Sequence, residues 1–129
     1  MSRPASKHPT ELELEILKVL WERSPLSGRE VKVALGPARK PAYTSVMTIL
    51  SIMVDKGYCA REKSGAVFLY HPKVTREATR RRMLRDMADR VFDGSTAAIL
   101  VNLIDSPDVK EDELRELRKI LDKKSEETK

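Results

Sequence analysis

AYTSVMTILSIMVDKG, residues 42–57, is the stretch that decides the predicted fold. At the 3.6-residue period of an α-helix, its apolar side chains gather on one face: Val46, Ile49, Leu50, Met53 and Val54. The opposite face carries mostly short polar side chains: Thr44, Thr48, Ser51 and Asp55. We therefore expect a helix that buries one face and can lie close against another surface with the other, because no long side chain intervenes.

Two β-rich runs follow this helix directly. Gly57 ends the helix, and residues 58–63 and 66–71 then have the composition of strands, with Ser64-Gly65 as a tight turn between them. A helix followed by a two-stranded ribbon is typical of a winged helix-turn-helix, in which a recognition helix enters the major groove of DNA.

Two shorter helices are predicted before this one. A capping-box pair at Thr10 and Glu13 begins the first, whose apolar stripe continues to Trp21. Residues 12–16 alternate between apolar and acidic, which also fits a strand, but the capping box and the continuation to Trp21 favour a helix. A second capping box lies at residues 27–30. Three helices within about fifty residues match a helix-turn-helix core.

Further amphipathic helices are predicted from Thr75 onward. Their apolar stripes are wide, and the chain leaves little else to cover them. We expect an intertwined homodimer to bury them, since two-fold symmetry is the commonest way in which oligomers form. The alternative is that these helices fold back on their own head. The expected dimerisation residues are Met83, Met87, Val91, Ile99, Leu103, Leu114, Leu117, Ile120 and Leu121.

The predicted fold is mostly α-helical, with a winged helix-turn-helix head, a two-stranded wing and a C-terminal helical dimerisation region. Residues 1–9 are expected to be a disordered basic lead, and residues 10–73 the DNA-binding head. Residues 74–124 are expected to form the dimerisation region, and residues 125–129 a frayed tail.

The formal net charge of +5 is unevenly distributed along the 129 residues. Residues 1–74 hold 12 Lys/Arg and 7 Asp/Glu, residues 75–92 hold 6 and 3, and residues 93–129 hold 7 and 10. A polyanion would therefore meet the first two thirds of the chain rather than the tail. A solvated surface without a partner is the alternative that charge alone leaves open.

Other function classes find little support. Cys59 is the only cysteine, which excludes an intrachain disulfide, and its strand-like surroundings favour a small core side chain over a redox switch. No apolar run approaches the ~20 residues of a membrane span, so we expect no membrane insertion and a soluble, cytoplasmic protein. His8 and His71 accompany no nucleophile or phosphate loop. We predict neither an enzyme, a cofactor nor a metal site.

In the residues of its predicted helices and wing, the chain resembles the penicillinase-repressor family. This family includes β-lactamase and methicillin-resistance repressors and copper-responsive relatives. The resemblance covers roughly residues 10–121, and its most specific piece is AYTSVMTIL at 42–50. The supporting pieces are ELEI at 13–16, LW at 20–21, KG at 56–57 and GAVFLYHP at 65–72. The resemblance implies a dimeric winged-helix repressor that binds an inverted-repeat operator in double-stranded DNA.

Three departures from the family pattern matter. Ile52 stands where the family often has Arg, which alters any DNA contact there. Copper-responsive relatives carry a C-terminal cysteine motif, but this chain has neither Cys nor His after His71, so copper sensing is not expected. Penicillin-responsive members are cut at an Asn–Phe bond by a membrane-linked sensor protease, an implied partner, and the matching pair here is Asn102-Leu103.

The resemblance places the operator contacts at Tyr43, Thr44, Ser45 and Thr48, and Ser51 lies on the same polar face. Hydroxyl groups can hydrogen-bond to phosphates or to base edges. The alternative interpretation is that Thr44 and Ser45 cap the helix and that Tyr43 belongs to the core.

Cations on either side of the helix are the second group of expected DNA contacts. Arg39 and Lys40 precede the helix, and Arg61 and Lys63 lie on the wing. They would neutralise phosphates and make binding salt-dependent. Ordinary solvated charges are the alternative interpretation.

The sequence therefore predicts a dimeric DNA-binding transcriptional repressor. The resemblance implies release by proteolysis near Asn102-Leu103, while the sequence itself leaves open release by proteolysis, by a ligand or by neither. A winged-helix module that contacts only proteins is the alternative from another class. A basic head and an acidic tail fit both, and salt-sensitive retention on duplex DNA would separate them.

Overall fold

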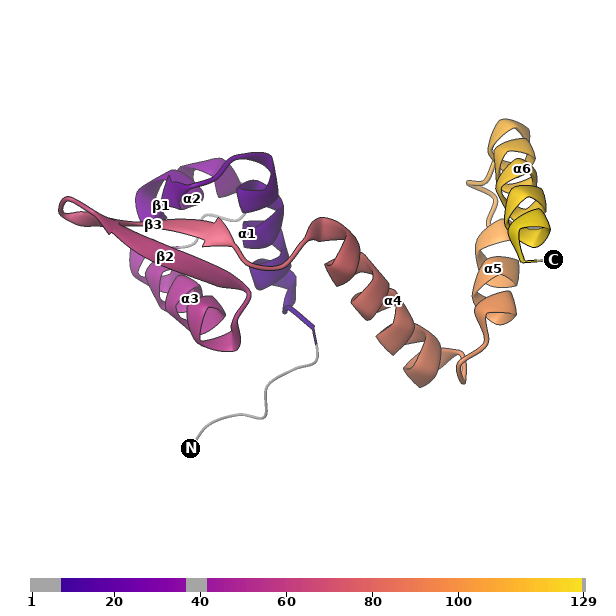
Figure 1. Cartoon of the computed structure of the whole chain (residues 1–129), viewed down its shortest axis with the longest axis horizontal. Coiled ribbons are helices and arrows are strands. Elements are labelled where there is room, and N and C mark those ends of the chain that lie inside the picture. The colour runs from indigo at the N-terminus through magenta and orange to yellow at the C-terminus, as the bar shows by residue number, and fades with distance from the viewer. Residues whose placement is uncertain (1–7, 37–41, 129) are drawn as a thin grey trace. The chain divides into compact units, whose positions relative to one another are not determined.

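The structure is a computed structural model that describes residues 8–36 and 42–128. Its elements are α1 (Glu11–Glu22), β1 (Leu26–Ser27), α2 (Gly28–Leu35), α3 (Tyr43–Lys56), β2 (Cys59–Ser64), β3 (Val67–Pro72), α4 (Arg76–Val91), α5 (Thr96–Ile104) and α6 (Glu111–Glu127) (Figure 1). The mostly helical winged-helix architecture confirms the predicted fold class. The expected phosphate contacts Arg39 and Lys40, and most of the predicted basic lead, lie outside the described residues.

Two compact units make up the chain, one up to Leu84 and one from Arg85 onward. The first unit, called the head below, therefore includes residues 74–84, which the sequence assigned to the dimerisation region. The first turns of α4 are tied into the head by buried groups such as Thr79, which is 6% exposed. At the other end, α6 continues to Glu127, past the predicted helical limit at residue 124.

The wing is part of a three-stranded antiparallel sheet in the order β1-β3-β2. In β2 and β3 the register runs from Cys59 opposite Pro72 to Ser64 opposite Val67. The third strand, β1, pairs Leu26 with Tyr70 and was not predicted, because a two-residue strand has no periodicity to detect. In Figure 1 the turn end of the β2–β3 hairpin extends beyond the helices of the head.

Helix α3 divides into two faces, as its sequence predicted. Val46, Leu50 and Met53 are fully buried in the head core, together with side chains of α1, α2 and the sheet. The polar face is exposed. Gly57 ends the helix in the left-handed conformation at φ 84°, which glycine adopts without the steric cost that a Cβ atom brings.

Both predicted capping boxes are present, so residues 12–16 are helical and not a strand. Thr10 and Glu13 cap α1 reciprocally, and Ser27 and Glu30 cap α2 in the same way. Gly28, the first residue of α2, lies so close to α3 that a Cβ atom there would overlap the Sδ atom of Met47. The start of α2 therefore lies directly against α3.

A partly buried ion pair joins the ends of α1 and α3. The Lys56 Nζ atom lies 3.1 and 3.0 Å from the two carboxylate oxygens of Glu13, whose side chain is only 4% exposed. The same carboxylate accepts the backbone N–H of Thr10 at 2.8 Å. Near the other end of α1, the Trp21 indole N–H donates to the Val74 carbonyl oxygen at 2.9 Å and anchors the segment between β3 and α4.

Cys59 lies in the core at the start of β2 and is 1% exposed. Burial raises the pKa of its thiol to about 11, so almost none of it is thiolate at neutral pH. Because the thiolate is the nucleophilic form of cysteine, this environment fits the predicted core role of Cys59 and disfavours a redox switch.

The second unit leaves much of its apolar surface uncovered. Ile99 is 8% exposed and Ala88 is 3% exposed, and α6 contains no buried residue among those described. Its large exposed side chains are Met87, Val91, Val101, Leu103, Ile104, Leu114, Ile120 and Leu121. So many exposed large apolar side chains within one small unit favour an interaction surface, because soluble monomers rarely expose large apolar patches.

The ion pair between α1 and α3 yields the first prediction. We expect Glu13→Ala to lower the free energy of unfolding of the head by about 2–4 kcal/mol, because it removes a cap and leaves the Lys56 ammonium without its partner. The measurement is urea unfolding followed by the fluorescence of Trp21, the only tryptophan. Glu62→Ala, on the exposed surface of β2, is the control and should change stability by less than about 0.5 kcal/mol. Equal effects of the two substitutions would contradict the assignment.

Candidate nucleic-acid interface

The exposed face of α3 presents a row of hydroxyl groups. Thr44, Ser45, Thr48 and Ser51 are all exposed. Neither Thr44 nor Ser45 caps the helix, because the N-cap residue is Ala42 and no side-chain hydrogen bond is made there. The structure thus disfavours the capping alternative for these two residues and leaves their hydroxyl groups directed at solvent.

Thr48 has a more restricted hydrogen-bonding capacity than its neighbours. Its Oγ1–H donates to the carbonyl oxygen of Thr44 at 2.9 Å. In this rotamer the hydroxyl hydrogen is engaged, and only the oxygen lone pairs remain for an external partner. Thr48 is therefore suited to accept from the amino group of adenine or cytosine rather than to donate to a phosphate.

Tyr43 begins α3 and is not a core residue, since 38% of it is exposed. The Arg29 guanidinium of α2 lies over its ring, 4.9 Å from the centroid. Such stacking restricts the guanidinium while leaving its N–H edge free to bind an anion. Arg29 was not among the predicted contacts, because its sequence position inside a capping box gave no sign of the proximity to Tyr43.

The wing carries a second stack of the same type. Arg61 and Lys63 lie two residues apart on β2, hence on one face of the strand, and both are exposed. The Arg61 guanidinium lies over the ring of Phe68, 4.6 Å from its centroid, and Lys63 is directly opposite Phe68 in the register. An exposed aromatic residue within a basic hairpin was the available sequence signal for this contact.

Helix α3 and the wing border a common hollow. A cavity of about 160 Å³ is lined by Gly28 and Arg29 of α2, Tyr43 and Met47 of α3, and Phe68 of β3. The two arginine–aromatic stacks therefore contribute residues to the same part of the surface. Together with the hydroxyl row, they form a polar, cationic surface around the start of α3, which we call the α3–wing surface.

The remaining predicted residues lie in the second unit or at its border. Met83 is half-buried on the head side of α4, and Ile99 is buried within its own unit, so neither offers the exposed surface that Val91, Ile120 and Leu121 do. Asn102 and Leu103 are exposed inside α5, where the Asn102 side-chain amide donates to the Ala98 carbonyl oxygen at 2.8 Å.

The described residues show neither a metal site nor a membrane span. No group of three or more His, Cys, Asp or Glu side chains is placed to hold a metal ion in this part of the chain. None of the helices within residues 8–36 and 42–128 combines the length and apolar character needed to cross a bilayer.

Comparison with known proteins finds relatives within one family of repressors. The family described as penicillinase repressor matches residues 9–123. The transcriptional regulator BlaI of Mycobacterium tuberculosis is 31% identical over 113 residues, which are 86% of this chain and 80% of that protein. The penicillinase repressor of Bacillus licheniformis is 25% identical over 113 residues, 88% of each chain.

A third relative and a solved structure are also similar to this chain. The methicillin resistance regulatory protein MecI of Mammaliicoccus sciuri is 23% identical over 112 residues, 87% of this chain and 91% of that protein. A MarR family protein from Bacillus stearothermophilus is 19% identical, with a TM-score of 0.48 over 93% of this chain and 75% of that one. The match to the family spans both the head and most of the second unit. The chain belongs to the penicillinase-repressor family of DNA-binding transcriptional repressors.

Proposed function

We propose that this protein is a homodimeric repressor that inserts α3 into the major groove of an inverted-repeat operator. The observation that carries the proposal is the α3–wing surface, where exposed hydroxyl groups of α3 are flanked by Arg29, Arg61 and Lys63. Hydroxyl groups on a slim helix face suit base edges, and the flanking cations suit the phosphates on either side.

In this proposal, hydrogen bonds from α3 to base edges contribute only modestly to sequence selectivity. Helix α3 contains no Arg, Asn or Gln, the side chains that pair with guanine or adenine through two hydrogen bonds. Its hydroxyl groups offer single hydrogen bonds, and the Thr methyl groups and Ile52, which is 42% exposed, suit the methyl group of thymine. The spacing of half-sites and the shape of the duplex then supply much of the selectivity.

The phosphate contacts are held in place before DNA binds. Tyr43 restricts Arg29 and Phe68 restricts Arg61, so less side-chain entropy is lost when each guanidinium meets a phosphate. Tyr43 acts in this scheme chiefly as a positioning residue.

The second unit supplies the dimer. Its exposed apolar side chains include Val91, Val101, Leu114, Ile120 and Leu121, which a second copy of the chain would cover. A two-fold symmetric dimer presents two copies of α3 in opposite orientations, and this arrangement matches an inverted repeat.

Release by proteolysis at Asn102-Leu103 is the regulatory part of the proposal. Both residues are exposed, but they lie within α5, and the Asn102 amide is bound to the preceding turn. Since proteases act on locally opened chain, α5 must unwind there before the bond is cut. Cleavage would separate α6 from the rest of the chain and remove much of the dimer surface.

The test of base reading compares two kinds of variant. We expect Thr44→Ala combined with Thr48→Ala to reduce the preference for operator over mismatched DNA by about tenfold, because base contacts are lost. Arg29→Ala should weaken binding to all duplexes alike and lower the salt slope by about one, as for a lost phosphate contact. The measurement is binding at several salt concentrations to an operator selected from random duplexes with the unaltered protein. An undiminished sequence preference in the double variant would refute the proposed role of α3.

The dimer is tested by placing a charge on its expected surface. We expect Leu121→Asp to shift the protein to monomer in sedimentation experiments and to weaken operator binding at least about a hundredfold, since a buried unpaired carboxylate is strongly unfavourable. Lys123→Asp, on a different face of α6, is the matched control and should remain dimeric. A monomeric unaltered protein at operator-binding concentrations would disprove the dimer.

The proteolytic step is tested by loosening α5. In cells that contain the cognate membrane-linked protease and an inducer, the chain should yield fragments that end at Asn102 and begin at Leu103. Ala98→Gly should speed cleavage about fivefold, because glycine destabilises a helix interior by about 1 kcal/mol. Ser106→Gly, which lies beyond α5, is the control. An uncut chain under inducing conditions would exclude proteolytic release.

A further inference from the structure

A cavity of about 290 Å³ lies in the head on the side of α4, away from the residues assigned to DNA. Its lining comes from three stretches that are distant in the sequence: His8 and Pro9 before α1, Tyr58 after α3, and residues 74–82, which enter α4. All of these lining residues belong to the head unit, so the described lining lies within one compact body.

The walls of this cavity are largely apolar. The ring of Tyr58 and the side chains of Val74, Ala78 and Pro9 provide its hydrocarbon surface. Thr79 adds little free polarity, because its hydroxyl already donates to the Thr75 carbonyl oxygen at 2.8 Å. Such a lining suits the body of a small apolar molecule.

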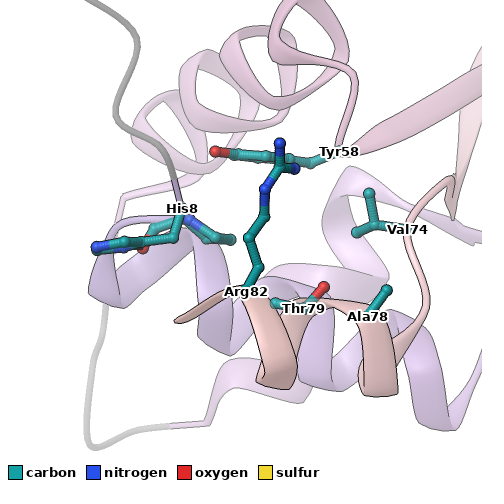
Figure 2. Close-up of a pocket in the computed structure, with 7 residues that line it drawn as sticks. His8, Tyr58, Val74, Ala78, Thr79 and Arg82 are labelled. Atoms are coloured by element: carbon teal, nitrogen blue, oxygen red, sulfur yellow. Dashed lines mark hydrogen bonds between the residues drawn. The ribbon is translucent and has the colours of Figure 1, made fainter. Parts of the chain in front are cut away.

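Arg82 gives the cavity its charge. Figure 2 shows its side chain extending from α4 toward Tyr58, with His8 on one side and Val74 on the other. Among the residues that the structure describes, no acidic side chain lines the cavity. The next acidic side chain along α4, Asp86, is ion-paired with Arg90 at 3.2 Å, and Lys56, 5.8 Å above the Tyr58 ring, is paired with Glu13. Arg82 is the one Lys or Arg side chain in the described lining of the cavity.

We propose that this cavity binds a small monocarboxylate with a single apolar ring or short branched chain. The Arg82 guanidinium holds the carboxylate at the exposed mouth, since its planar array of N–H donors matches two carboxylate oxygens. The apolar body lies against Tyr58, Val74 and Ala78. The cavity is at the lower end of the volumes of ligand sites, which limits the body to about one ring.

Charge complementarity excludes the other simple ligand classes. An amine would meet the Arg82 cation, and the described lining residues offer it no carboxylate. A bare inorganic anion would leave the apolar walls unused, and an uncharged ring would leave the guanidinium without an anion. Only a ligand that combines an anionic end with an apolar body uses both parts of the lining.

The test uses full-length protein without DNA, so its outcome is independent of the repressor proposal. Benzoate is the probe, with benzamide, benzylamine and inorganic phosphate as comparison ligands in calorimetric titrations. We expect saturable binding of benzoate and at least about tenfold weaker binding of the other three, because each lacks one of the two matched parts. Phosphate binding as tight as that of benzoate would overturn the proposal, as would benzoate binding that does not saturate.

Variants then locate the site. Arg82→Gln should weaken benzoate binding at least about tenfold, and Arg82→Lys should restore part of it. Ala78→Leu should abolish it by filling the cavity, at an exposed helical position that tolerates leucine. Arg81→Gln, which removes a neighbouring charge outside the lining, is the matched control and should bind as the unaltered protein does. Equal losses in the Arg81 and Arg82 variants would show non-specific attraction and overturn the site.

Discussion

Burial of one face of α3 is the constraint on which the rest of the molecule depends. Val46, Leu50 and Met53 are fully buried, and burying side chains of this size contributes about 1.5–3 kcal/mol each. Because a helix turns by 100° per residue, fixing these three side chains also fixes which residues face outward. The outward face consists of short hydroxyl side chains, so the packing that stabilises the head also determines its candidate DNA surface.

Contacts at both ends of α3 prevent it from sliding or rotating. At the start, Gly28 allows α2 to approach Met47 closely, and Arg29 stacks on Tyr43. At the end, Lys56 is held by the buried carboxylate of Glu13, which is itself engaged in the cap of α1. Since side chains at an interface must be positioned to within a fraction of an ångström, this double attachment favours precise contacts with DNA.

Features that depend on neighbouring residues could be predicted from the sequence. Contacts between distant segments could not. Both capping boxes, the end of α3 at Gly57 and the two faces of that helix were predictable, because neighbouring residues determine them. The pairing of Leu26 with Tyr70, and the stacking of Arg29 on Tyr43, depend on how distant segments pack. For the same reason periodicity placed Ile99 on the dimer surface, although it is buried within its own unit.

The exposed side chain of Ile52 affects which bases α3 can contact. It lies on the exposed side of the helix, 42% exposed, at a position where the resembling family often has arginine. An arginine there would offer two hydrogen bonds to one guanine, whereas isoleucine offers only apolar contact, which favours the methyl group of thymine. The outer face carries no long polar side chain between Thr44 and Asp55, and hydroxyl groups can bond to any base, so in the proposed complex Ile52 would bias α3 toward A·T pairs. Runs of such pairs narrow the minor groove and stiffen the duplex, so recognition by shape and recognition by contact would select similar sequences.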